Sequence, residues 1–110
     1  MKIITAKSPW NIEQLTTTLN NKLNVLFKEH RHTDIDFNIV TDREANTIEI
    51  NQPEYYEDYL FRIELKGNEL YVAKSEHYVD DINFITLQSI IETLQMERLD
   101  GADIVYISGE

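Results

Sequence analysis

Apolar residues recur along the chain with two different periods, and the changes of period divide it into predicted helices and strands. Residues 2–6 are β-prone and predict a first strand. Apolar side chains then follow at spacings of three and four, which indicates an amphipathic helix ending near residue 30. Ser8 is expected to cap this helix, with Pro9 as its first residue. Its predicted buried stripe is Ile12, Leu15, Leu19, Leu23 and Leu26.

Beyond this helix the period becomes two, which is typical of strands with one buried face. Residues 35–39 and 47–51 alternate in this way and predict an antiparallel pair, joined by a polar turn over residues 41–46. Pro53 is expected to close the second of these strands. The side chains predicted to face the core are Ile35, Phe37, Ile39, Ile48 and Ile50.

A second hairpin is predicted from the alternation in residues 59–65 and the β-prone run 70–74. Gly67-Asn68 between them is a tight-turn sequence. A second helix follows, capped by Asp80 or Asp81, and a last strand is predicted over residues 104–107 after the helix breaks at Gly101. The apolar stripe of this second helix is Leu87, Ile90, Ile91 and Leu94.

The resulting order is β-α-β-β-β-β-α-β, which predicts an α+β fold, an antiparallel sheet with two helices packed on one face. The 110 residues suit a single acidic domain over 1–110. The chain has no cysteine, no apolar run of membrane-spanning length and no signal-peptide pattern at its start, so we expect a cytoplasmic protein. No Gly-rich phosphate loop or nucleophile motif is present, and the sequence predicts neither an enzyme nor a cofactor.

The charge of the chain is strongly negative and unevenly distributed. Its net charge is −10, with +3 over residues 1–33 and −13 over residues 34–110. If the apolar residues of the strands face the core, alternation places four acids on the opposite face of the sheet. A surface of this kind attracts proteins with basic clefts, although a charged outer face also serves simply to prevent sheets from pairing. These four acids are Asp34, Asp36, Glu49 and Glu64.

Two segments combine carboxylates with tyrosines, which is typical of contact surfaces for Arg and Lys. The first precedes the second hairpin, and the second precedes the second helix. Their alternative interpretation is structural, as loops leading into a strand and a helix. The candidate partner-binding residues in them are Glu54, Tyr55, Tyr56, Glu57, Asp58, Tyr78, Asp80 and Asp81.

Two weaker patterns concern metal chemistry. Residues 29–36 contain His30, His32 and nearby carboxylates, but a polar helix end where His and Arg suit the helix dipole explains them better. Glu54, followed by Glu64 and Lys66, loosely matches a metal-dependent nuclease motif, yet the acidic charge opposes binding of a DNA substrate. The sequence therefore predicts no metal site.

In length, charge and α+β composition the chain resembles small acidic proteins of phages and mobile elements that block host nucleic-acid enzymes. Anti-CRISPR proteins, antirestriction proteins and uracil-DNA glycosylase inhibitors are of this type. The resemblance implies an inhibitor of DNA-mimic type that occupies the basic, nucleic-acid-binding site of a partner protein, binding neither nucleic acid nor membrane itself. The alternatives are an immunity protein or antitoxin for a basic toxin, and a small structural or assembly subunit. A homodimer is left open.

Overall fold

The order of secondary-structure elements in the computed structural model confirms the predicted order. The structure describes residues 1–78, 81–98 and 104–109. No helix among these residues is long and apolar enough to cross a membrane. The elements are β1 (Lys2–Ala6), α1 (Ile12–Arg31), β2 (Asn38–Asp42), β3 (Thr47–Asn51), β4 (Phe61–Lys66), β5 (Glu69–Lys74), α2 (Ile82–Arg98) and β6 (Ile104–Gly109).

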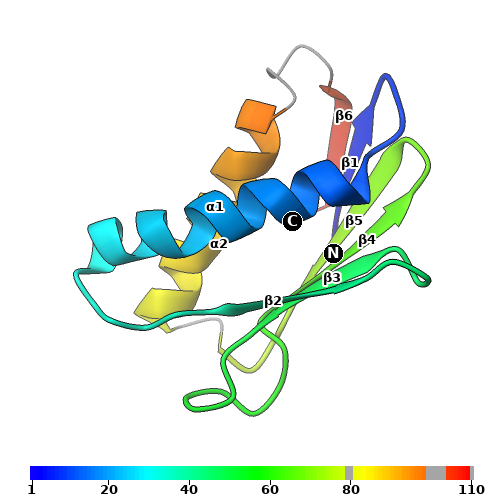
Figure 1. Cartoon of the computed structure of the whole chain (residues 1–110). Helices are drawn as coiled ribbons and strands as arrows, with labels where there is room; N and C mark the ends of the chain where they lie inside the picture. Colours follow the sequence, from blue (N-terminus) through cyan, green and yellow to red (C-terminus); the bar gives the residue numbers. More distant parts are fainter. Residues whose placement is uncertain (79–80, 99–103, 110) are drawn as a thin grey trace.

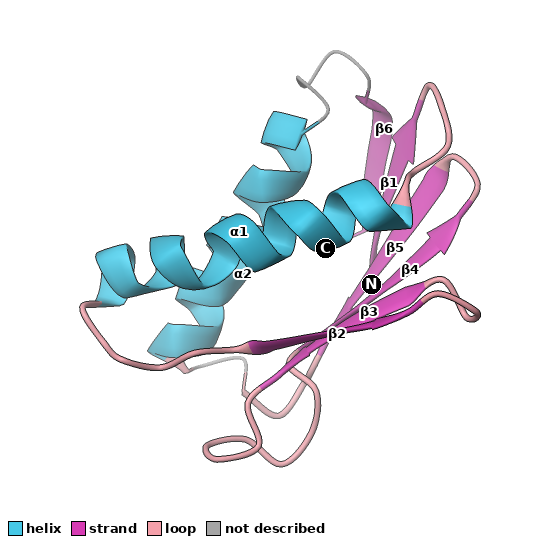
Figure 2. Ribbon diagram, in the orientation of Figure 1, coloured by secondary structure: helices cyan, strands magenta, loops and turns pink. Residues whose placement is uncertain are grey.

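The six strands form one sheet in the order β2-β3-β4-β5-β1-β6, and every neighbouring pair is antiparallel (Figure 1). β1 is inserted between β5 and β6, so the two ends of the chain lie on adjacent strands. Both helices lie on the same face of the sheet, where they cross each other (Figure 2). The predicted α+β architecture with helices on one face is therefore confirmed.

The hydrophobic core fills the space between this sheet face and the helices. Alternate residues of the central strands point inward, as the period of two requires. The helices bury the stripes predicted from their spacing except for Ile12 and Leu26, which are partly buried, and each adds a phenylalanine, Phe27 in α1 and Phe84 in α2. Phe27 packs edge-on against Phe37 with 4.7 Å between ring centroids, and Phe84 stacks on Phe61 at 4.8 Å. The side chains exposed by less than 2% include Leu15, Leu19, Leu23, Ile48, Ile50, Leu60, Ile63 and Leu70.

The first helix begins three residues later than Ser8 and Pro9 predicted. Its N-cap is Asn11, whose side-chain oxygen accepts hydrogen bonds from the backbone N–H groups of Glu13 and Gln14 at 2.9 and 3.1 Å. Residues 7–10 are instead held against the β4–β5 turn, where the Trp10 backbone N–H donates to the carbonyl of Gly67. This tertiary contact overrides the capping preference of Ser8.

The second strand also begins later than predicted. β2 starts at Asn38, so residues 34–37 lie outside the sheet although they alternate in polarity. The side chain of Asn24 in α1 bonds both backbone groups of Phe37, accepting from its N–H at 2.7 Å and donating to its carbonyl at 3.0 Å. This amide takes the backbone groups that a neighbouring strand would otherwise pair with. Tyr59 similarly precedes β4, which begins at Phe61.

The turn and cap signals in the second half of the chain were correct. Gly67 adopts a positive φ of 59° in the two-residue turn between β4 and β5. Asp81 caps α2, accepting from the backbone N–H groups of Asn83 and Phe84 at 2.8 and 3.2 Å. Asp80, the alternative cap, and Gly101 lie outside the described residues.

The position of the α1 cap is testable with a matched pair of substitutions. Asn11→Ala removes the acceptor for two backbone N–H groups and should lower the free energy of unfolding by about 0.5–2 kcal/mol. Ser8→Ala, at the exposed position expected from the sequence, should change it by less than about 0.5 kcal/mol. Urea denaturation measures both, and a larger loss for Ser8→Ala would contradict the assigned cap.

Candidate functional site

The open face of the sheet does not carry the row of four acids that alternation predicted. Glu49 and Glu64 do lie on it, but each has a basic neighbour. Glu49 pairs with Arg62 on the adjacent strand at 2.6 Å, and Glu64 pairs with Lys66 at 3.3 Å. Asp34 and Asp36 are absent from this face because β2 begins after them. The prediction of an acidic sheet face is therefore wrong.

The acids gather instead at one end of the sheet, where three loops meet (Figure 1). Asn38, the first residue of β2, pairs with Asn51, the last of β3. Phe61, the first of β4, pairs with Lys74, the last of β5. The segments before β2, between β3 and β4, and after β5 therefore leave the sheet at the same end. We call these loops, residues 32–37, 52–60 and 75–81, the acidic end.

The sequence of the acidic end contains eight acidic residues and no Lys or Arg. Two stand in residues 32–37, three in residues 52–60 and three in residues 75–81. Six of them are exposed in the described part of the chain, and the side chains of five of these make no ion pair. The exception is Asp36, which pairs with Lys28 of α1 at 2.7 Å. The exposed acids are Asp34, Asp36, Glu54, Glu57, Asp58 and Glu76.

A first cleft brings together four of the residues predicted to contact a partner. It has a volume of about 440 Å³ and lies between residues 34–38 and 52–55. Asp34, Asp36 and Glu54 line it together with Tyr55, whose side chain is 61% exposed. Carboxylates beside an aromatic ring are groups that bind a guanidinium or an ammonium, through charged hydrogen bonds and contact with the ring face.

A second cleft, of about 410 Å³, opens on the other side of loop 52–60. Asp58, Tyr59 and Glu76 line it, and Lys74 and His77 lie in its wall. Asp58 was expected from the sequence, whereas Tyr59 was predicted to lie in a strand and Glu76 was not among the predicted contact residues. The adjacency of Glu76 to Asp58 depends on the pairing of β4 with β5, which the sequence around either residue does not show.

Hydrogen bonds within loop 52–60 and to the two neighbouring loops hold this loop in place. Gln52, 8% exposed, donates its side-chain amide to the carbonyl of Asp36 and accepts from the backbone N–H of Glu54 at 3.0 Å. The backbone N–H of Glu57 donates to the Tyr78 hydroxyl at 3.1 Å. Three segments distant in sequence thus hold the clefts in shape, which lowers the ordering cost of binding a partner there.

Three of the predicted contact residues have structural roles inside this arrangement. Tyr56 is buried, packs edge-on against Tyr78 at 4.8 Å between ring centroids, and donates its hydroxyl to the Asp81 carboxylate at 3.2 Å. Asp81 also caps α2, so its charge is committed to protein groups. Tyr56 is therefore buried beneath the acidic end, and Tyr78 and Asp81 are half-buried beside it. Asp80 lies outside the described residues.

The surroundings of Tyr56 raise the pKa of its hydroxyl. Burial raises the pKa of its hydroxyl above the ordinary value, Asn83 acts in the opposite direction through a hydrogen bond, and the charge of Asp81 raises the pKa further. A raised pKa means that folding favours the protonated phenol. Its contribution to stability is complete below the unfolded-state pKa of about 10 and is lost as the pH rises through the folded-state pKa.

The patterns considered for metal chemistry do not assemble into a site. Among the described residues no group of three His, Asp or Glu side chains is arranged to hold a metal ion. His32 is the C-cap of α1, in the left-handed conformation with φ 55°. Glu54 lies in a loop at the acidic end, whereas Glu64 lies inside β4 on the open face, paired with Lys66. The nuclease-like spacing therefore does not place these acids together.

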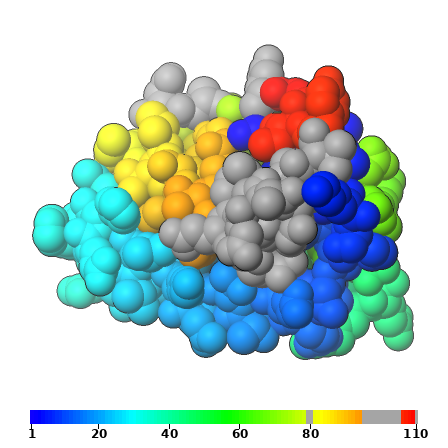
Figure 3. Space-filling model, turned by 90° about the horizontal axis from the view of Figure 1, so that it is seen from above, coloured from blue at the N-terminus to red at the C-terminus, as the bar shows by residue number. Residues whose placement is uncertain are grey.

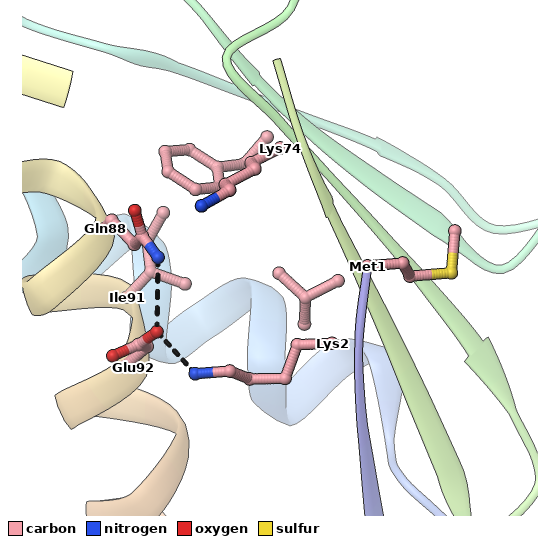
Figure 4. Close-up of a pocket in the computed structure, with 8 residues that line it drawn as sticks. Met1, Lys2, Lys74, Gln88, Ile91 and Glu92 are labelled. Atoms are coloured by element: carbon pink, nitrogen blue, oxygen red, sulfur yellow. Dashed lines mark hydrogen bonds and ion pairs between the residues drawn. The ribbon is translucent and has the colours of Figure 1, made fainter. Parts of the chain in front are cut away.

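A small enclosed cavity lies under α2, beside the first residues of the chain (Figure 4). Its volume is about 20 Å³, and Phe61, Val72 and Ile91 form its apolar wall. Lys2 closes the rim by donating to Glu92 at 2.5 Å. A cavity of this size holds about one water molecule, so it does not suit a substrate or cofactor.

No known protein family matches the chain, and neither a curated protein nor a solved structure is significantly similar to it. We therefore infer a function from the residues of the acidic end.

The role of Tyr56 gives a pH-dependent prediction. Tyr56→Phe removes the hydroxyl that donates to Asp81, and should lower the free energy of unfolding at pH 7 by about 0.5–1.5 kcal/mol. Above pH of about 10 the wild type should lose stability more steeply than the variant, because only the wild type has this phenol to ionise. Urea denaturation at a series of pH values measures the effect.

Tyr55→Phe is the matched control, since the neighbouring ring is largely exposed. It should keep the wild-type dependence on pH. If the free energy of unfolding of Tyr56→Phe and of the wild type falls equally above pH of about 10, the buried phenol does not contribute to the pH dependence of stability.

Proposed function

We propose that this protein is a non-enzymatic inhibitor whose acidic end occupies the basic, nucleic-acid-binding site of a partner protein. The observation that supports this most is the gathering of exposed carboxylates on three loops that contain no Lys or Arg. Like charges at close range repel, so such an arrangement costs stability unless a cation is present. A partner that supplies Lys and Arg side chains removes this repulsion on binding.

The clefts of the acidic end suit individual side chains of a partner better than they suit a flat partner surface. The two clefts lie on either side of loop 52–60, and each contains a tyrosine and at least two carboxylates. A bidentate Arg–carboxylate pair forms in such a cleft with both charge and geometry matched. Several of these pairs at once give affinity for a surface with clustered basic residues.

A basic cluster of this kind is the surface with which proteins hold phosphate groups. A rigid array of carboxylates competes for the same Lys and Arg side chains as a nucleic-acid backbone. Competition, and not chemistry on a substrate, is therefore the proposed mode of action. The outward charge of the acidic end also steers a basic partner toward it and raises the association rate at low salt.

The proposal predicts a location-specific effect of charge reversal. Immobilised wild-type protein should retain a nucleic-acid-binding protein from a lysate of the native host, and short duplex DNA should compete for that protein. Reversing two exposed acids of the acidic end, Glu54→Lys with Asp58→Lys, should weaken the binding by about tenfold or more, equivalent to about 1.4 kcal/mol. Raised salt should weaken it further, because exposed charges are screened.

The matched control reverses two exposed acids elsewhere, Glu29→Lys with Glu44→Lys, which changes the net charge equally. Binding should stay within about twofold of the wild type if the location of the charge matters. Equal losses for the two double variants would show that only net charge attracts the partner. Capture of a secreted toxin that DNA does not displace would favour an immunity protein or antitoxin over the proposed inhibitor.

A further inference from the structure

The strand β6 forms one edge of the sheet and exposes apolar side chains on both of its faces. Tyr106 lies on the open face and is 63% exposed. Ile107 lies on the helix-side face, in register with the buried Ile4, yet it is 42% exposed. In Figure 3 the atoms of β6, coloured red, form part of the molecular surface beside β1.

The backbone of an edge strand has unpaired N–H and C=O groups, and natural proteins protect such edges with charges, prolines or a covering element. The six residues of β6 read Ile-Val-Tyr-Ile-Ser-Gly and include no charged residue and no proline. The side chains of Tyr106 and Ser108 form no hydrogen bond with the described residues. The strand itself therefore carries neither a charge nor a proline that would oppose pairing with another strand.

The other edge strand, β2, is protected by α1. Near the start of β2, Asn24 bonds the backbone of Phe37. Near its end, Thr16 and Thr41 join their hydroxyls at 2.9 Å. Beyond the strand, Arg43 forms a two-pronged ion pair with Glu13. α1 thus contacts β2 at Thr41 and the residues just before and after the strand, at Phe37 and Arg43.

The charge of the molecule indicates which partner suits β6. A chain of net charge −10 repels a second acidic surface, and the residues of β6 itself add no charge to this repulsion when two copies approach. An isologous two-fold contact places the same uncharged strand on both sides. We propose that β6 pairs with β6 of a second copy, so that the two six-stranded sheets join into one continuous sheet.

This pairing satisfies the edge backbone groups of both strands and brings Tyr106 and Ile107 of each copy against those of the other. Pairing of identical strands by a two-fold axis is antiparallel, as in every other neighbouring pair of this sheet. The acidic ends then lie on the two copies away from the joining strand, so the contact leaves the clefts open. The inference does not depend on the proposed function.

The strand is tested at its centre and not at its end, where Gly109 is tightly packed. Gly109 has φ 87°, and a Cβ there would collide with the carbonyl oxygen of Met1, so any substitution disturbs the pairing of β6 with β1. Tyr106→Lys and Ile107→Lys place a charge on either face of the strand without this clash. Lysine on an edge strand is a common natural barrier to further pairing.

The experiment is sedimentation equilibrium over a range of protein concentration. The wild type should show a mass approaching twice the chain mass of 13.0 kDa as concentration rises. Each lysine variant should raise the dimer dissociation constant by about tenfold or more. Salt should tighten the wild-type dimer, because it screens the repulsion between two acidic chains, which is the opposite of its expected effect on a basic partner.

Val40→Lys is the matched control, since Val40 is 53% exposed on the opposite edge strand. It should leave the dimer intact. Circular dichroism and thermal melting establish that Tyr106→Lys and Ile107→Lys remain folded, and the greater exposure of Tyr106 makes that variant the safer one. A wild type that stays monomeric, or a dimer that Val40→Lys disrupts while both β6 variants keep it, overturns the proposal.

Discussion

The architecture depends on covering one face of an antiparallel sheet with two helices. Leu19 and Phe27 of α1 are fully buried, as are Ile63 and Leu70 of the central strands. Burying a large aliphatic or aromatic side chain stabilises the fold by about 1.5–3 kcal/mol, so this layer supplies most of the driving force. Because both helices are used on one face, the other face and the ends of the sheet are shielded by loops and polar side chains.

The distribution of charge follows from this arrangement. On the open face, strands lie side by side, and cross-strand neighbours such as Arg62 and Glu49 neutralise each other. At the acidic end, three loops converge without a lysine or arginine of their own, so carboxylates such as Asp34 and Glu54 share a cleft. Acidic side chains on the open face are therefore neutralised by basic neighbours, whereas those of the acidic end lie close to one another. That difference supports a binding role at the loops.

The two edge strands of the sheet, β2 and β6, differ in their contacts with the helices. α1 contacts β2 through Thr16 and Thr41, and Asn24 and Glu13 bond Phe37 and Arg43 on either side of the strand. β6 is added beyond β1, and Ile107 is 42% exposed there despite an inward orientation. The position of β1 between β5 and β6 is what places this apolar strand at an edge.

The sequence by itself determined the order and type of all eight elements, because periods of 3.6 and 2 record which side chains each element buries. It also marked the Gly67 turn and the Asp81 cap, which depend on neighbouring residues alone. Only the tertiary structure decided where α1 and β2 begin. It also decided which residues lie next to each acidic side chain. Asn24 and Gln52 act on backbone groups far along the chain, and strand pairing sets which loops meet, so no local pattern of residues contains that information.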